Sequence, residues 1–88
     1  MAEIASVQNP VTEHARRKGW LVRRMQFIGR RGCPDSWFFR RGRVVIVEFK
    51  DTGKPPDDQQ SRRIRELREA GMEVHIIDNA EDGYALFD

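Results

Sequence analysis

The residues with the clearest chemical potential lie between Asp35 and Lys50. Asp35 follows a proline, Glu48 comes after twelve intervening residues, and Lys50 stands two positions later in a run of Val, Ile and Phe. Charges in such an apolar run are usually paired or bound to a metal. Two carboxylates can hold one divalent cation such as Mg²⁺, and a lysine beside them can stabilise negative charge on a phosphate. The pattern predicts metal-assisted attack on a phosphodiester.

Simpler roles are open for the same side chains. Glu48 and Lys50 could form a salt pair at a strand end, which contributes little stability when exposed. Asp35 could be a turn residue whose carboxylate bonds its own backbone. A shared site requires that the chain fold so that all three meet, so the surrounding elements decide between the two interpretations.

Periodicity, caps and glycines predict a helix, three strands, a second helix and a fourth strand. Asn9 and Pro10 are typical of a helix start, and Asp57 with Gln60 has capping-box spacing before a helix that ends at Gly71. The helices are expected over 10–18 and 57–70, the strands over 20–28, 35–39, 44–50 and 72–78, and a last helical turn or two within 79–87.

This order predicts an α/β fold with a mixed four-stranded sheet flanked by helices. The strand–helix–strand unit from 44 to 78 should form a right-handed parallel crossover, with 44–50 as a central strand. Phe49 then faces one side of the sheet, and Glu48 and Lys50 face the other. Because ligands bind at the carboxyl ends of strands in open α/β sheets, both charges are expected at the rim beside Asp35.

The composition limits the remaining classes of protein. The 88 residues suffice for one small domain spanning 1–88, and 34% of them are charged, so the core must be thin and dimerisation would help it. No run approaches the roughly 20 apolar residues that cross a bilayer, and the N-terminus has no apolar signal-peptide centre. Cys33 is the single cysteine, which fits a reducing cytoplasm.

Positive charge is concentrated in the first half of the chain. Residues 1–50 hold eleven Lys and Arg against four acids, a net charge of +7, whereas residues 51–88 have a net charge of −5. Arginines spread along a folded surface favour contact with phosphates, although a solvated face without a partner is the simpler alternative. The candidate nucleic-acid-binding residues are Arg23, Arg24, Arg30, Arg31, Arg40, Arg41 and Lys54.

The ordered set of motifs resembles the VRR-NUC branch of the PD-(D/E)xK nuclease superfamily. It comprises a glycine-containing loop before Asp35, the strand ending in Glu48-Phe49-Lys50, a Gly-Lys-Pro loop at 53–55 and a helix that a glutamine opens. The resemblance covers roughly residues 10–78 and implies a restriction-endonuclease-like core.

The resemblance also implies roles for individual residues. Asp35 and Glu48 would bind Mg²⁺ or Mn²⁺, with the carbonyl of Phe49 as a third ligand, and Lys50 would be the catalytic lysine. Glu13 would assist at the metal, directly or through water; otherwise it is an ordinary helix acid.

The motif glutamine is either Gln59 or Gln60. Gln60 shares a helix face with Ile64 and Leu67, so it is preferred, although it could serve only in the capping box. Gln59 fits the loop spacing slightly better but points toward another face.

The expected function is that of a stand-alone, phage-like endonuclease that cuts DNA. A homodimer with two symmetric sites would suit branched DNA such as four-way (Holliday) junctions, and the apolar strand Trp37-Phe38-Phe39 is a candidate for the subunit contact. Two alternatives are a catalytically silent nucleic-acid-binding module on the same fold and an RNA-directed nuclease. The sequence does not discriminate DNA from RNA.

Overall fold

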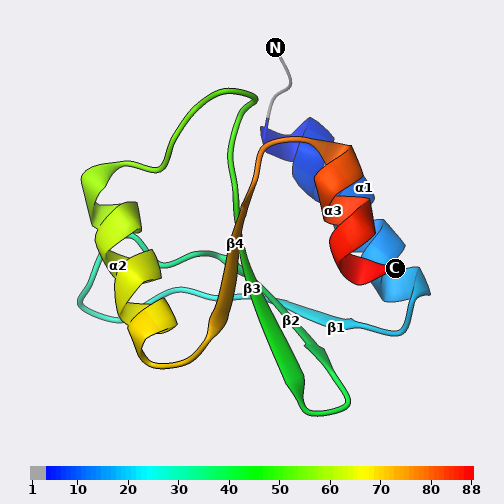
Figure 1. Ribbon diagram of the computed structural model, residues 1–88, viewed down its shortest axis with the longest axis horizontal. Coiled ribbons are helices and arrows are strands. Elements are labelled where there is room, and N and C mark those ends of the chain that lie inside the picture. Colours follow the sequence, from blue (N-terminus) through cyan, green and yellow to red (C-terminus); the bar gives the residue numbers. More distant parts are fainter. Residues whose placement is uncertain (1–3) are drawn as a thin grey trace.

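A mixed sheet lies between helices in the computed structural model, which describes residues 4–88 (Figure 1). This arrangement confirms the predicted α/β class. The elements in chain order are α1 (Ile4–Arg17), β1 (Leu21–Arg24), β2 (Ser36–Arg40), β3 (Arg43–Phe49), α2 (Asp58–Glu69), β4 (Glu73–Ile77) and α3 (Ala80–Phe87).

The four strands follow one another across the sheet in the order β1-β2-β3-β4. β1, β2 and β3 pair antiparallel, whereas β3 and β4 pair parallel through the connection that contains α2. The strand predicted to be central, β3, is therefore hydrogen-bonded on both sides. Its residues 45–49 are all buried, as expected for a strand covered on both faces.

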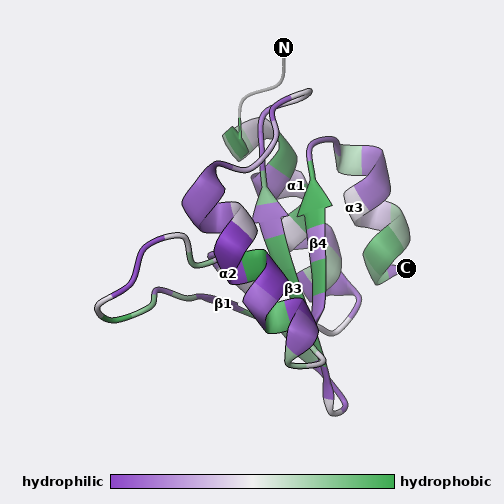
Figure 2. Ribbon diagram, turned by 60° about the vertical axis from the view of Figure 1, so that its left-hand side comes forward, coloured by the Kyte–Doolittle hydropathy of each residue, from purple (hydrophilic) through white to green (hydrophobic). Residues whose placement is uncertain are grey.

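Two apolar clusters hold the helices to the sheet. Val45, Val47 and Phe49 face α1 and α3, whereas Ile46 faces Ile64 of α2. Figure 1 shows α1 and α3 together on one side of the sheet and α2 on the other, and Figure 2 shows apolar residues of β3 and β4 between them. The alternation along β3 thus separates the two clusters and leaves Glu48 on the α2 face.

A glycine permits the close approach of the two helices that share a face. A Cβ built on Gly83 of α3 would lie 2.4 Å from Cγ2 of Val11 on α1. A larger residue there would force the helices apart, so this position ties the C-terminal helix to the first one.

Two element boundaries differ from the sequence-based prediction. α1 begins at Ile4, and Pro10 lies inside it. Val7 and Val11 are almost fully buried on either side of the proline, and this packing outweighs the local preference for a helix start. β1 ends at Arg24, where its regular pairing with β2 stops. One more hydrogen bond follows, from the amide of Met25 to the carbonyl of Asp35 at 2.8 Å. Pro34 comes next and has no N–H with which to continue the ladder.

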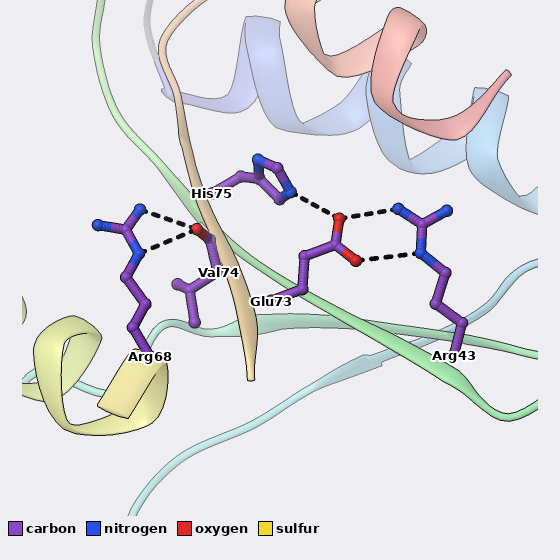
Figure 3. A network of polar contacts seen from close by, with 5 residues as sticks. All are labelled: Arg43, Arg68, Glu73, Val74 and His75. Atoms are coloured by element: carbon purple, nitrogen blue, oxygen red, sulfur yellow. Dashed lines mark hydrogen bonds and ion pairs between the residues drawn. The ribbon is translucent and has the colours of Figure 1, made fainter. Parts of the chain in front are cut away.

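An ion-pair network joins β3 and β4 at the end where β4 begins (Figure 3). Nε and Nη2 of Arg43 donate to the carboxylate of Glu73 at 3.0 and 2.8 Å, and Nε2 of His75 lies 2.8 Å from the same carboxylate. Arg68 of α2 donates to the carbonyl of Val74.

Within residues 4–88, no helix is long and apolar enough to cross a membrane.

Candidate active site

Two carboxylates meet where β2 begins and β3 ends. Ser36 pairs with Val47 and Trp37 with Ile46, so continuing this register by one residue sets Asp35 opposite Glu48. Trp37 and Ile46 belong to the cluster under α2, and alternation gives Asp35 and Glu48 the same face. Both line a pocket of about 200 Å³ at this end of the sheet, together with Phe49, Lys50 and Gln60.

Glu48 is held in an environment that opposes its charge. Its side chain emerges from a buried stretch of β3, and the residue is 6% exposed. Burial and then the negative charge of Asp35 raise the pKa of Glu48 to about 7, although the Lys50 ammonium acts in the opposite direction. The Glu48 carboxyl group therefore lies beside a second carboxylate, and within residues 4–88 it forms no ion pair of its own.

Lys50 is tied to the first turn of α2. Its Nζ donates to Oε1 of Gln60 at 3.2 Å. The same oxygen accepts from the amide of Asp57 at 3.0 Å, while the Asp57 carboxylate accepts from the amide of Gln60 at 2.8 Å, which completes a capping box. Gln60 therefore caps the helix and contacts the lysine at once, whereas Gln59 is exposed. The structure brings Gln60, not Gln59, to the pocket.

Asp35 is held by neighbours from two other elements. One carboxylate oxygen accepts from Oγ of Ser36 at 3.2 Å, and that hydroxyl accepts from Nε2 of Gln8 on α1 at 3.3 Å. The other oxygen forms an ion pair with Arg24 of β1. The close approach of the preceding loop to α2 needs a glycine, because a Cβ on Gly32 would lie 2.6 Å from the carbonyl oxygen of Gln59.

Glu13 does not reach this pocket. It lies on the exposed side of α1, with its carboxylate 3.7 to 4.0 Å from Arg17 and Arg16. The residue of α1 that lines the pocket with a buried polar side chain is Gln8. Glu13 is five positions after Gln8, which is a rotation of about 140° around a helix with 3.6 residues per turn, so the two side chains cannot face the same way.

The structure does not favour the predicted role of Glu13 at the metal, because Glu13 lies about 200° around the helix from both Val11 and Ala15, which mark the side of α1 that meets the sheet. In the sequence, the apolar residues Val7, Val11 and Ala15 recur at i, i+4 and i+8, which indicates that α1 begins before Pro10 and turns this side toward the sheet, where all three are buried. That register also brings Gln8 next to the sheet.

Five of the seven predicted phosphate-binding residues fall into two groups. Arg24, Arg30 and Arg31 line a pocket of about 560 Å³ that also includes Asp35, so they border the carboxylate site. Arg40 and Arg41 lie at the β2–β3 turn, at the opposite end of β3 from Glu48, which is roughly 15 Å away at the usual rise per residue. The structure therefore places only the first group beside the site.

Two further basic residues of the predicted set have other neighbours. Arg23 donates from Nη1 to the carbonyl of Val22 at 2.9 Å. Lys54, in the loop after β3, lies 3.8 Å from the carboxylate of Asp51. Both side chains are on the surface, and neither lines the two pockets that contain Asp35.

The donor set fits a hard divalent cation. Asp35 and Glu48 supply carboxylate oxygens, Phe49 lines the same pocket and can supply its carbonyl, and such ligands suit Mg²⁺ or Mn²⁺ better than zinc. Burial and then repulsion by Asp35 raise the pKa of Glu48, and a cation between the two carboxylates would relieve the repulsion. Across residues 4–88 no three His, Cys, Asp or Glu side chains gather into a possible metal cluster, so the remaining ligands would have to be carbonyls or water.

Known proteins resemble this chain over most of its length. A solved structure named "VRR_NUC domain" matches with a TM-score of 0.86 and 31% sequence identity, over 97% of this chain and 95% of that one. A curated protein from Acyrthosiphon pisum secondary endosymbiont phage 1, named "Putative nuclease p44", is 27% identical over 77 residues, which are 86% of this chain and 83% of that protein. No family model matches the chain. The structural likeness covers both helical layers and the sheet end that carries the pocket.

Proposed function

The chain belongs to the VRR-NUC nuclease family, and from that premise we propose that it is a Mg²⁺- or Mn²⁺-dependent endonuclease that hydrolyses DNA. The observation that carries this proposal is the meeting of Asp35, Glu48, Lys50 and Gln60 around one pocket at the end of β3. The two carboxylates come from neighbouring strands and the lysine from the strand end, so the sheet itself sets their separation. A nucleic-acid-binding module without activity would not need this group of side chains.

In the proposed reaction, water adds across a backbone P–O bond, and the chain's residues hold the groups that react. A bound cation would supply charge that neutralises the phosphate oxygens. Asp35 and Glu48 would hold it, with the Phe49 carbonyl as a third ligand. Lys50 presents its ammonium to the pocket and stabilises negative charge that develops on the phosphate. Gln60, which accepts a hydrogen bond from Lys50 at 3.2 Å, keeps that ammonium in place.

The arginines support a nucleic acid as the substrate. Arg24, Arg30 and Arg31 border the carboxylate site, and such side chains bind the phosphate backbone without reading its sequence. RNA has the same phosphates, so an RNA-directed nuclease is the second candidate. A reducing cytoplasm, that of a bacterial host if the gene is carried by a phage, suits a chain with one cysteine.

We further propose that the protein acts as a homodimer on branched DNA such as four-way junctions. One site per chain cuts one strand, whereas two sites related by a two-fold axis match a substrate with the same symmetry. The aromatic strand Trp37-Phe38-Phe39 offers little surface for a subunit contact, because Phe38 is fully buried and Trp37 packs under α2. Ile76, which is 40% exposed on β4 beside an apolar groove with Pro56 and Ile64, is a better candidate.

The direct test uses labelled linear, single-stranded, flapped and four-way-junction DNAs, with matched RNA, in Mg²⁺, Mn²⁺ or EDTA. We expect cleavage of DNA that EDTA abolishes. Full cleavage in EDTA would contradict the metal requirement, and preferential cleavage of RNA would favour the second candidate.

Assembly and junction preference need separate measurements. Light scattering at micromolar concentration should give twice the mass of the 10.3 kDa chain. A monomer that still cuts would remove the symmetry argument. Competition between a four-way junction and a linear duplex of the same sequence should favour the junction, and equal cleavage would leave a general nuclease.

A further inference from the structure

The Asp35 carboxylate, which the proposed function assigns to a metal, already has a cationic partner. Nη2 of Arg24, the last residue of β1, donates to Oδ2 of Asp35, while Oδ1 accepts from Ser36 at 3.2 Å. The two paired side chains are 64% and 43% exposed, so water reaches both. An exposed pair of this kind is weak enough to open.

A second anion could take the place of Asp35 as the partner of Arg24. Arg24 lines the pocket of about 560 Å³ in which Arg30, Arg31 and Asp35 also lie. A DNA phosphate in this pocket would meet a guanidinium whose planar fork suits phosphate as well as carboxylate. Arg24 therefore shares one pocket with the Asp35 carboxylate and with two arginines that favour phosphate.

A divalent cation and the Arg24 guanidinium would compete for the negative charge of Asp35. They carry charge of the same sign, and each would lower the affinity of Asp35 for the other. Once displaced, the Arg24 side chain would be free to pair with another anion, and the substrate backbone would supply one in the neighbouring pocket.

We propose that Arg24 is an exchangeable counter-ion: it neutralises Asp35 in the metal-free protein and transfers to a DNA phosphate when the cation binds. This inference rests on the proposed function. It makes Arg24 a positioning residue that couples the two binding events, so that each ligand increases the affinity for the other.

The first measurement is Mn²⁺ binding by titration calorimetry without DNA, in wild type, Arg24→Gln and Arg23→Gln. Both substitutions remove one positive charge from β1, but Arg23 donates to the carbonyl of Val22 and alternation turns it to the other face. Arg24→Gln should bind Mn²⁺ about two- to fivefold more tightly, the range expected from losing an exposed ion pair. Arg23→Gln should stay within the error of wild type.

The second measurement is DNA affinity by fluorescence anisotropy, with and without Ca²⁺, after a gel has shown that the DNA stays intact. In wild type, Ca²⁺ should tighten DNA binding. In Arg24→Gln, DNA binding should be weaker than in wild type. The increase in DNA affinity that Ca²⁺ produces should also be smaller, by the same factor by which the substitution increased the affinity for Mn²⁺, because coupling between two ligands is reciprocal.

The outcomes separate this inference from the function on which it rests. Weaker Mn²⁺ binding in Arg24→Gln would overturn the inference, since Arg24 would then orient Asp35 for the metal. Equal tightening in Arg23→Gln would also overturn it, because only general charge would matter. Absence of Mn²⁺ binding in wild type would instead remove the metal site itself, and the role of Arg24 with it.

Discussion

Two glutamates on adjacent parallel strands show opposite electrostatic behaviour. Glu73 opens β4, where Arg43 donates to it twice and His75 lies beside it, and the hydrogen bond from Arg43 lowers its pKa (Figure 3). Glu48, near the end of β3, is buried beside another carboxylate, and its pKa is raised to about 7. The same side chain is thus compensated at one end of the strand pair and short of positive charge at the other.

The difference distinguishes a structural ion pair from a site that needs a ligand. Arg43 and Glu73 complete each other's hydrogen bonding within the chain. The pocket with Asp35 and Glu48 places two carboxylates side by side, and a bound cation would offset the repulsion between them. Strongly perturbed carboxyls in a cleft are typical of functional sites, and the contrast with Glu73 shows that this perturbation comes from placement rather than residue type.

The largest effect should come from neutralising the uncompensated glutamate. Glu48→Gln keeps the size of the side chain but removes a charged metal ligand, so we expect cleavage to fall by on the order of a hundredfold or more. Glu73→Gln is the matched control and should cut at the wild-type rate. Initial rates on labelled DNA measure both. Comparable losses in the two variants would mean that the two ends of the strand pair do not differ in function.

Lys50→Ala should produce the next largest loss. The ammonium is expected to act on the charge that develops in the reaction, so turnover should fall by roughly 10²-fold while Mn²⁺ still binds. Lys18→Ala, at the end of α1 and paired with Asp88, is the control for removing a lysine. Calorimetry with Mn²⁺ decides the role of Lys50, because loss of Mn²⁺ binding with the fold intact would assign Lys50 to the metal site instead.

Stability should change in the direction opposite to activity. The folded-state pKa of Glu48, about 7, lies above its ordinary value of 4.5, so the folded protein binds the proton more tightly and loses stability as pH rises from about 4.5 to 7. In EDTA at pH 8, Glu48→Gln should therefore be more stable than wild type by about 1–2 kcal/mol, a figure reduced for solvent screening.

Thermal unfolding at several pH values checks this prediction. The gain from Glu48→Gln should vanish near pH 4, where Glu48 is protonated in both states, and Mn²⁺ should stabilise wild type but not the variant. A lower melting temperature for Glu48→Gln at pH 8 in EDTA would show that the charge of Glu48 is compensated within the chain after all.

The smallest effect should come from Glu73, whose charge is compensated by Arg43. Glu73→Gln breaks a two-point contact with Arg43 that is half exposed, so it should lower stability by at most about 1 kcal/mol at neutral pH. The pKa of Glu73 is lowered in the fold, so this contribution is present above the ordinary glutamate range and is lost as pH falls through the lowered value. Denaturant unfolding at pH 7 and pH 3 should show a smaller difference at pH 3 than at pH 7; an equal difference at both pH values would point to packing.

Several features of this protein follow from the sequence alone because local rules specify them. Alternation along β3 put Phe49 on one face and Glu48 on the other, and the capping-box spacing of Asp57 and Gln60 opened α2 at the right place. The order of strands and helices was enough to predict the mixed sheet and its central strand. These depend on the chemistry of residues close together along the chain.

Other features were decided only by tertiary structure. Which side of α1 meets the sheet depends on packing across the core, and that packing brought Gln8 to the pocket and left Glu13 in solvent. The pairing of Arg24 with Asp35 depends on the register of β1 against β2, and the raised pKa of Glu48 depends on burial and on the neighbouring Asp35. Each of these is a distance between residues far apart in the chain, and local propensity carries no information about such distances.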